Sequence, residues 1–174
     1  MQTSLAWDEA RKGNAARGDH HVGYRAEVPA HYFAYGSNLS PARMRERVPS
    51  AQARGAARLP GYRLALDKRG ADGSGKANLH EASDAAVWGA LYTLEPEEWP
   101  LLDAYERDYE RIAVRVEWRG VQQDAMTYVS RVLTDAPVAL HGYKRLIVEG
   151  ARAHALPESW IRWLAALPER PDPR

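Results

Sequence analysis

The chain of 174 residues contains no cysteine. A disulfide framework, a thiolate nucleophile and a cysteine-ligated zinc are therefore excluded. An excess of charge of one sign is also lacking, because 24 Lys and Arg balance 23 Asp and Glu, and no basic run exceeds two residues. Nucleic-acid binding leaves a basic patch or stripe in a sequence, so we expect no nucleic-acid partner.

Long apolar runs are missing as well. No stretch approaches the roughly 18 apolar residues that a membrane-spanning helix needs, so we expect no membrane partner. The six histidines are scattered, without the spacing that zinc ligands show, and we expect no metal site. Residues 1–30 are polar and lack the apolar segment of a secretory signal. We interpret them as a flexible extension and expect a cytoplasmic protein.

The rest of the chain suits one globular domain, which we place at residues 31–170. Periodicity of the apolar residues predicts both strands and helices there. Strands are expected at residues 31–35, 51–66 (two pieces around Pro60-Gly61), 77–80, 86–94, 110–118 and 121–129. Helices are expected at residues 41–48, 95–106, 139–155 and 157–167. The Arg119-Gly120 pair is a hairpin signal, so the sheet is at least partly antiparallel.

Residues 67–76 contain three glycines and no apolar period, which predicts a loop. Its Gly-Ser-Gly-Lys sequence resembles part of a phosphate-binding loop, but Ala77 stands where that motif requires Ser or Thr. ATP binding is therefore set aside. In the first helix, Met44 and Val48 are expected to face the core, while the polar residues around them face solvent: Arg43, Arg45, Glu46 and Arg47.

The most informative local pattern is Tyr32-Phe-Ala-Tyr-Gly-Ser-Asn-Leu39, an apolar strand that runs into a small polar turn. Gly36 permits positive φ, and Ser40 followed by Pro41 is typical of a helix start. Such a junction can present several backbone N–H groups to a small anion. An ordinary strand-turn-helix connection is the alternative. Ser37 as a nucleophile is disfavoured, since the second glycine of a nucleophile elbow is absent.

Without cysteine or metal, the candidate acid and base is a carboxylate. Asp103 and Glu106 are three residues apart near the end of the helix expected at 95–106, where burial and the helix dipole raise a carboxyl pKa. Glu106 is therefore a candidate general base. The alternative is a solvated Glu106 paired with Arg107 or Arg111. Three other carboxylates compete with less context: Glu97, Glu98 and Glu110.

An ordered set of motifs across residues 31–167 resembles the gamma-glutamylcyclotransferase family. The set comprises the Tyr32–Leu39 segment, Pro49-Ser50-Ala51, Gly75 to Ala77, Val87-Trp88-Gly89, Leu102-Asp103-x-x-Glu106, Gly150-Ala151 and Leu156-Pro157. The resemblance implies an α+β fold whose mixed, mostly antiparallel, barrel-like sheet is flanked by helices. It also implies a small gamma-glutamyl substrate, cleaved without a cofactor to 5-oxoproline and a free amine or amino acid.

The resemblance further implies roles for individual residues. Glu106 becomes the general acid and base, and the substrate-binding residues become Tyr35, Gly36, Ser37, Asn38, Leu39 and Tyr109. Many relatives have glycine after the catalytic glutamate, whereas Arg107 stands here, in a loop that borders the leaving-group side in the family. The choice of substrate therefore stays open.

Three interpretations remain at this point. The protein cleaves gamma-glutamyl dipeptides, it cleaves a gamma-glutamylated biosynthetic intermediate, or it is a catalytically silent binding module in which Arg107 neutralises Glu106. The sequence leaves the oligomeric state open, with a homodimer as one option.

Overall fold

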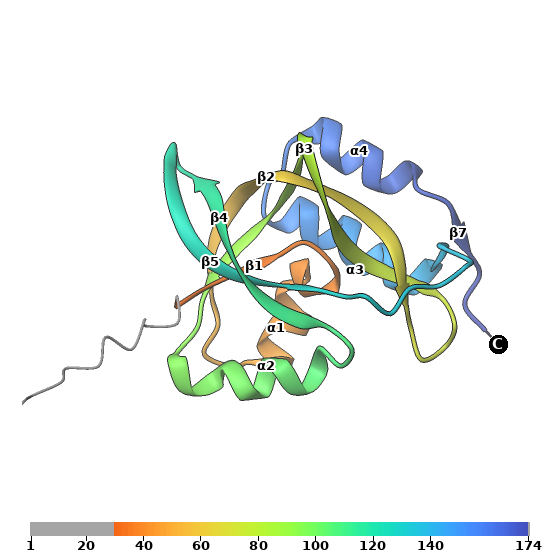
Figure 1. Cartoon of the computed structure of the whole chain (residues 1–174), viewed down its shortest axis with the longest axis horizontal. Helices are drawn as coiled ribbons and strands as arrows, with labels where there is room; N and C mark the ends of the chain where they lie inside the picture. The colour runs from red at the N-terminus through yellow and green to blue at the C-terminus, as the bar shows by residue number, and fades with distance from the viewer. Residues whose placement is uncertain (1–29, 174) are drawn as a thin grey trace, which may run out of the picture.

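Five strands close into a barrel in the computed structural model, which describes residues 30–173. The strands are β1 (His31–Ala34), β2 (Gln52–Arg69), β3 (Gly75–Thr93), β4 (Glu110–Trp118) and β5 (Val121–Val129). They run around the barrel in the order β1-β3-β2-β4-β5 (Figure 1). β1 pairs with β5 in parallel, at Tyr32 and Met126, and the other pairs are antiparallel. The expected mixed, mostly antiparallel α+β barrel is confirmed.

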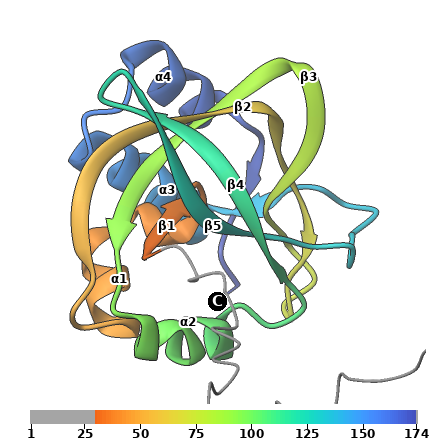
Figure 2. The ribbon, with the colours of Figure 1, turned by 60° about the vertical axis from the view of Figure 1, so that its left-hand side comes forward.

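β2 and β3 are longer than the sequence pattern predicts, since each is one continuous strand rather than two pieces. At Pro60 and Tyr62 the pairing register shifts, and Gly61 between them has φ of +78°, so β2 bends without ending. Pairing continues as far as Arg69 opposite Gly75. The loop expected at residues 67–76 is therefore only residues 70–74, and the two strands curve together as one long hairpin (Figure 2).

Four α-helices and two single 3-10 turns complete the main elements of residues 30–173. They are η1 (Ser37–Leu39), α1 (Pro41–Arg47), η2 (Pro96–Glu98), α2 (Trp99–Tyr105), α3 (His141–Ala153) and α4 (Glu158–Ala166). Two short strands, β6 (Ala139–Leu140) and β7 (Glu169–Arg170), pair in parallel. Ser40 caps α1 as expected. The helix expected at 95–106 instead begins as a 3-10 turn, which places Pro100 in the first turn of α2, where its missing N–H is tolerated.

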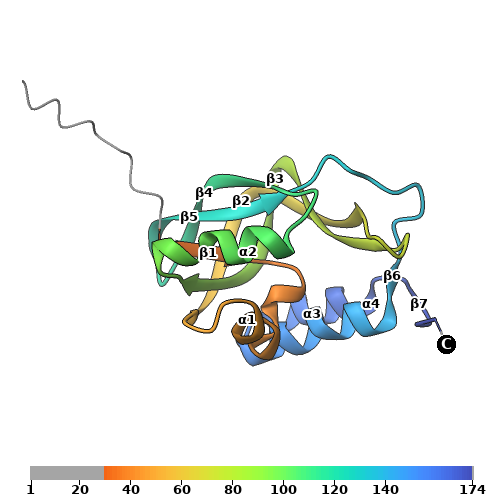
Figure 3. The ribbon, with the colours of Figure 1, turned by 90° about the horizontal axis from the view of Figure 1, so that it is seen from below.

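The helices α1, α3 and α4 lie along one side of the barrel, and α2 lies across a neighbouring face (Figure 3). Close backbone contact holds α3 against η1, because a Cβ at Gly150 would lie 2.3 Å from the carbonyl carbon of Leu39. A Cβ at Gly89 would lie 2.3 Å from the carbonyl oxygen of Ala34. That contact confirms the close backbone approach which a glycine inside a strand indicates.

The core joins the barrel to these helices. Phe33 of β1, Met44 of α1, Leu91 of β3 and Leu102 of α2 are all fully buried. None of the helices within residues 30–173 is long and apolar enough to cross a membrane. The extension expected at residues 1–30 lies outside the described residues except for Ala30, so that boundary stays a prediction.

Candidate active site

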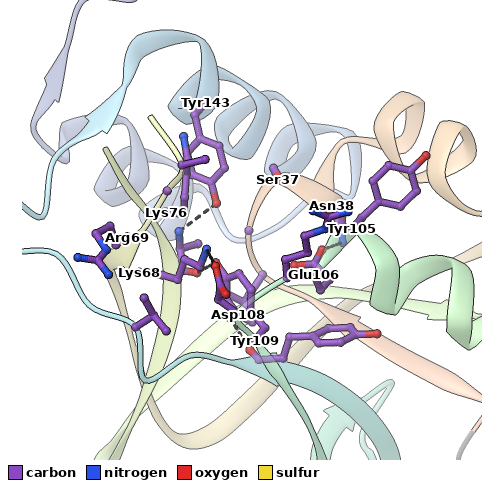
Figure 4. Close-up of a pocket in the computed structure, with 18 of the residues that line it drawn as sticks. Ser37, Asn38, Lys68, Arg69, Lys76, Tyr105, Glu106, Asp108, Tyr109 and Tyr143 are labelled. Carbon is purple, nitrogen blue, oxygen red and sulfur yellow. Dashed lines mark hydrogen bonds and ion pairs between the residues drawn. The ribbon is translucent and has the colours of Figure 1, made fainter. Parts of the chain in front are cut away.

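A cavity of about 980 Å³ opens where β1 and η1 meet α1, the tip of the β2–β3 hairpin, the end of α2 and the start of α3 (Figure 4). Glu106 lines it together with most of the predicted substrate-binding residues: Tyr35, Gly36, Ser37, Asn38 and Tyr109. The folded chain thus brings the loop at residues 36–38 and the carboxylate of Glu106 into one site, although nearly 70 residues separate them in sequence.

Glu106 caps the C-terminal end of α2, and its side chain is only 13% exposed. Its Oε1 accepts a hydrogen bond from Asn38 Nδ2 at 2.9 Å and another from Arg47 Nη1 at 2.9 Å. Burial raises the pKa of Glu106, and the opposing effects of Arg47 and Asn38 only partly offset that rise. A buried carboxyl group with a raised pKa holds a proton more readily than a solvated glutamate, which suits a group that must take up and return protons.

Asn38, Arg47 and Glu106 form a closed set of hydrogen bonds. Arg47 Nη1 donates to Asn38 Oδ1 at 2.8 Å as well as to Glu106. Asn38 Nδ2 is shared between Glu106 and the hydroxyl of Tyr32, at 2.8 Å from the latter. The expectation that Arg47 faces solvent is wrong, since its side chain is 11% exposed. A partner on another element, which spacing within α1 does not reveal, draws it inward.

Neither of the predicted alternative partners binds Glu106 in the structure. Arg111 lies 3.5 Å from the carboxylate of Asp103 and stacks over the ring of Trp99. Arg107 is exposed and lines the cavity. Asp103 accepts a hydrogen bond from the hydroxyl of Tyr128 at 2.6 Å, so the two carboxylates of α2 have separate partners.

The loop at residues 36–38 lines the cavity and contains unpaired backbone donors. Among residues 30–173, the backbone N–H groups of Gly36, Ser37 and Asn38 find no hydrogen-bond acceptor. Gly36 has φ of −108°, so it does not use the positive φ that glycine permits. Space is limited there, because a Cβ at Gly36 would lie 3.0 Å from the Cβ of Ala77.

Leu39 is the predicted substrate-binding residue that the structure places elsewhere. It is fully buried in the core and is absent from the cavity lining of the described residues. Its carbonyl accepts a hydrogen bond from His154 Nε2 at 3.0 Å, and its backbone packs on Gly150 of α3. The geometry gives Leu39 a role in fixing the loop rather than in touching a ligand.

Tyrosines form much of the remaining wall. The hydroxyl of Tyr109 donates to the carbonyl of Ala77 at 2.7 Å, and the N–H of Ala77 donates to the hydroxyl of Tyr143 at 2.9 Å. Burial raises the pKa of Tyr143 to about 12 and the pKa of Tyr109 further, so both are neutral donors at neutral pH. Within residues 30–173, no three His, Asp or Glu side chains are arranged to hold a metal ion.

Sequence patterns missed several residues of this site. Tyr32, Tyr143, Arg43 and Arg47 line the cavity but were not among the predicted site residues, and the two arginines were expected to face solvent. One signal was available for the two arginines, because they are four residues apart and so share a face of α1.

A five-stranded barrel with a buried carboxylate facing a Gly-Ser-Asn loop defines a small-molecule site of an α+β enzyme. The family model described as "Gamma-glutamyl cyclotransferase, AIG2-like" matches residues 32–155, and the chain belongs to this family of enzymes. It is 29% identical to a gamma-glutamylcyclotransferase of Mus musculus over 84% of the chain and 82% of the relative, and 30% identical to one of Homo sapiens over 78% and 77%. A solved structure of a gamma-glutamyl cyclotransferase superposes with a TM-score of 0.75 at 27% identity, covering 80% of this chain and 88% of the other.

Proposed function

We propose that this protein converts a gamma-glutamyl amide into 5-oxoproline and a free amine, with Glu106 as general acid and base. One observation carries the proposal: Asn38 Nδ2 lies 2.9 Å from Glu106 Oε1, which joins the donor loop to the carboxylate inside one cavity. The names of the mouse and human relatives support the same reaction class. A cytoplasmic location and a homodimer stay predictions.

The reaction begins when the Glu106 carboxylate removes a proton from the α-ammonium of the substrate. The resulting amine attacks the γ-carbonyl carbon, and a C–N bond closes the five-membered ring. Collapse of the tetrahedral adduct then breaks the original amide C–N bond. Overall, two protons move from the α-nitrogen to the departing nitrogen, and Glu106 relays them. No water is consumed, and no cofactor is required.

The loop supplies binding and electrostatic stabilisation in this scheme. The unpaired N–H groups of Gly36, Ser37 and Asn38 bind the α-carboxylate of the substrate or the developing oxyanion. Holding the substrate folded, with its amine against its own γ-carbonyl, provides much of the advantage of an intramolecular reaction. Tyr35 and Tyr109 line the cavity as further substrate contacts. Arg47 holds the base in place through its contacts with Asn38 and Glu106.

A catalytically silent module would need Glu106 to be neutralised by an arginine. Arg47 does contact it, yet burial outweighs that contact and raises the pKa of Glu106. This balance favours the catalytic alternative. A gamma-glutamylated biosynthetic intermediate remains the other substrate class, because the cavity is larger than a glutamyl group needs.

The test is an assay of purified protein against free gamma-glutamyl dipeptides and a gamma-glutamylated amine conjugate, with both 5-oxoproline and glutamate measured. We expect 5-oxoproline and the free amine in equal amounts. Release of glutamate would indicate hydrolysis and would contradict the mechanism. Faster turnover of the conjugate would assign the enzyme to a biosynthetic intermediate instead of a dipeptide.

A further inference from the structure

Positive charge is concentrated around the cavity. The charged residues that line it are two acids, Glu106 and Asp108, and six cations: Arg43, Arg47, Lys68, Arg69, Lys76 and Arg107. The whole chain has a formal net charge of only +1. Because a cleft with charge of one sign attracts ligands of the other sign, this lining selects for anions.

Two of the six cations have a close acidic partner within the protein. Arg47 binds Glu106 at 2.9 Å, and Lys76 binds Asp72 at 2.8 Å. Lys68 has only Asp108, at 3.4 Å, whose side chain is 59% exposed. The other three form no ion pair among residues 30–173: Arg43, Arg69 and Arg107.

Lys68 stands out because its side chain is only 8% exposed. Burial of an ammonium group is unfavourable unless a partner compensates it, and a single 3.4 Å contact with a largely exposed carboxylate does so only in part. Its Nζ lies 5.2 Å from the ring centre of Tyr109, as the Nζ of Lys76 lies 4.7 Å from that of Tyr143. Ala77 anchors the hydroxyls of both tyrosines, so the two ammonium groups are held at the cavity before any ligand binds.

These cations lie at the opposite side of the cavity from the catalytic carboxylate. In Figure 4, Lys68, Arg69 and Lys76 lie on one side, and Glu106 and Asn38 on the other. A glutamyl group bound beside Glu106 carries one carboxylate and one ammonium, which cancel. In a substrate whose α-carboxylate is bound by the loop, the departing amine extends from the γ-carbonyl away from the loop and is the part left to meet the cations.

We propose that Lys68, Arg69 and Lys76 form a subsite for an amine that carries two negative charges, a dicarboxylic amino acid or a phosphorylated amine. The proposal rests on the cyclotransferase function proposed above and names its leaving group. Charge-assisted hydrogen bonds are roughly twice as strong as neutral ones, so the second anionic group contributes directly to binding.

A matched pair of substrates tests the proposal: gamma-glutamyl-glutamate and gamma-glutamyl-glutamine differ in one carboxylate but hardly in shape. We expect kcat/KM for 5-oxoproline release to favour the glutamate compound by about tenfold or more at low ionic strength. Added salt should reduce the ratio, because it screens the partly exposed cations. Gamma-glutamyl-O-phosphoserine, tested alongside, shows whether carboxylate or phosphate fits better.

Variants of the subsite test whether its cations cause the preference for the glutamate compound. Lys68→Met keeps the apolar stem of the side chain and removes its charge, and Arg69→Gln removes the neighbouring charge; each should lower the glutamate-to-glutamine ratio several-fold. Arg63→Gln is the matched control, because Arg63 is an exposed residue of the same strand that does not line the cavity. It should leave the ratio unchanged.

The outcomes separate the two proposals. Equal kcat/KM for the glutamate and glutamine compounds, or a preference that survives in Lys68→Met and Arg69→Gln, would overturn the subsite and leave the cyclotransferase function standing. Absence of 5-oxoproline from every gamma-glutamyl compound would overturn both.

Discussion

The charged side chains are paired differently at the two ends of the cavity, the loop end at residues 36–38 and the hairpin end at the tip of β2 and β3. At the loop end, Asn38, Arg47 and Glu106 satisfy one another through hydrogen bonds of 2.8 to 2.9 Å. At the hairpin end, Lys68 has a single 3.4 Å contact with the exposed Asp108, and Arg69 forms no ion pair within residues 30–173. The loop end is thus organised before substrate arrives, as acid–base catalysis requires, whereas the hairpin end is completed by the ligand.

We expect the largest effect from a variant at the loop end of the cavity. Glu106→Gln removes the base but keeps an oxygen that accepts from Asn38 and Arg47, so the fold should survive. General acid–base catalysis contributes about 10²- to 10⁴-fold, and here one group has both roles. We therefore expect kcat for 5-oxoproline release to fall by about 10³-fold or more, measured under saturating substrate.

Asp103→Asn is the control for that variant. Asp103 lies on the same helix and can still accept from the hydroxyl of Tyr128 as asparagine. It should retain near-normal kcat, and its melting temperature should fall slightly because the 3.5 Å ion pair with Arg111 is lost. Full activity in Glu106→Gln would instead remove Glu106 from the mechanism.

A second change, Arg47→Met, separates two effects on the pKa of Glu106: the charge of Arg47 and the burial of the carboxyl group. Arg47 lowers the pKa of Glu106 while burial raises it, so loss of the guanidinium raises that pKa further. The base must be ionised to act, and the acid limb of kcat/KM against pH should therefore move to higher pH. At the acid end of the profile, activity should fall by about tenfold or more.

Arg47→Lys keeps a positive charge and should move the acid limb less than Arg47→Met does. The same substrate must be used for all three proteins, since the ionisation of its amine also shapes the profile. An acid limb that stays in place in Arg47→Met would show that a group other than Glu106 controls it.

The sequence predicted those parts of the site that have local signals. Glycine before Ser37 and Asn38, a cap at Ser40 and a carboxylate at the end of a helix are each visible within a few residues. The hairpin of β4 and β5 was equally predictable, because two alternating runs flank Arg119-Gly120. These features needed no information about distant contacts.

The residues that sequence missed depend on contacts between distant elements. Arg47 turns inward because Glu106, 59 positions away, completes its hydrogen bonds. Lys68 was assigned to a loop because residues 67–76 contain three glycines, whereas β2 continues to Arg69 and Lys68 follows the buried Leu64 and Leu66 at a period of two. Within the first helix, the shared face of Arg43 and Arg47 was the one local signal, and it did not show that another element covers that face.

The variant with the smallest expected effect tests whether the two ends of the cavity bind substrate independently. Gly150→Ala places a methyl group 2.3 Å from the backbone of Leu39, so α3 and η1 must move apart. Overpacking of this kind destabilises a protein by about 1–3 kcal/mol, measurable by urea unfolding. Gly142→Ala on the same helix meets only the side chain of Asp172, at 3.0 Å, and should cost much less. Because the strained contact is with Leu39 of the loop, Gly150→Ala should raise KM equally for gamma-glutamyl-glutamate and gamma-glutamyl-glutamine. A changed ratio between the two substrates would show that the ends are coupled.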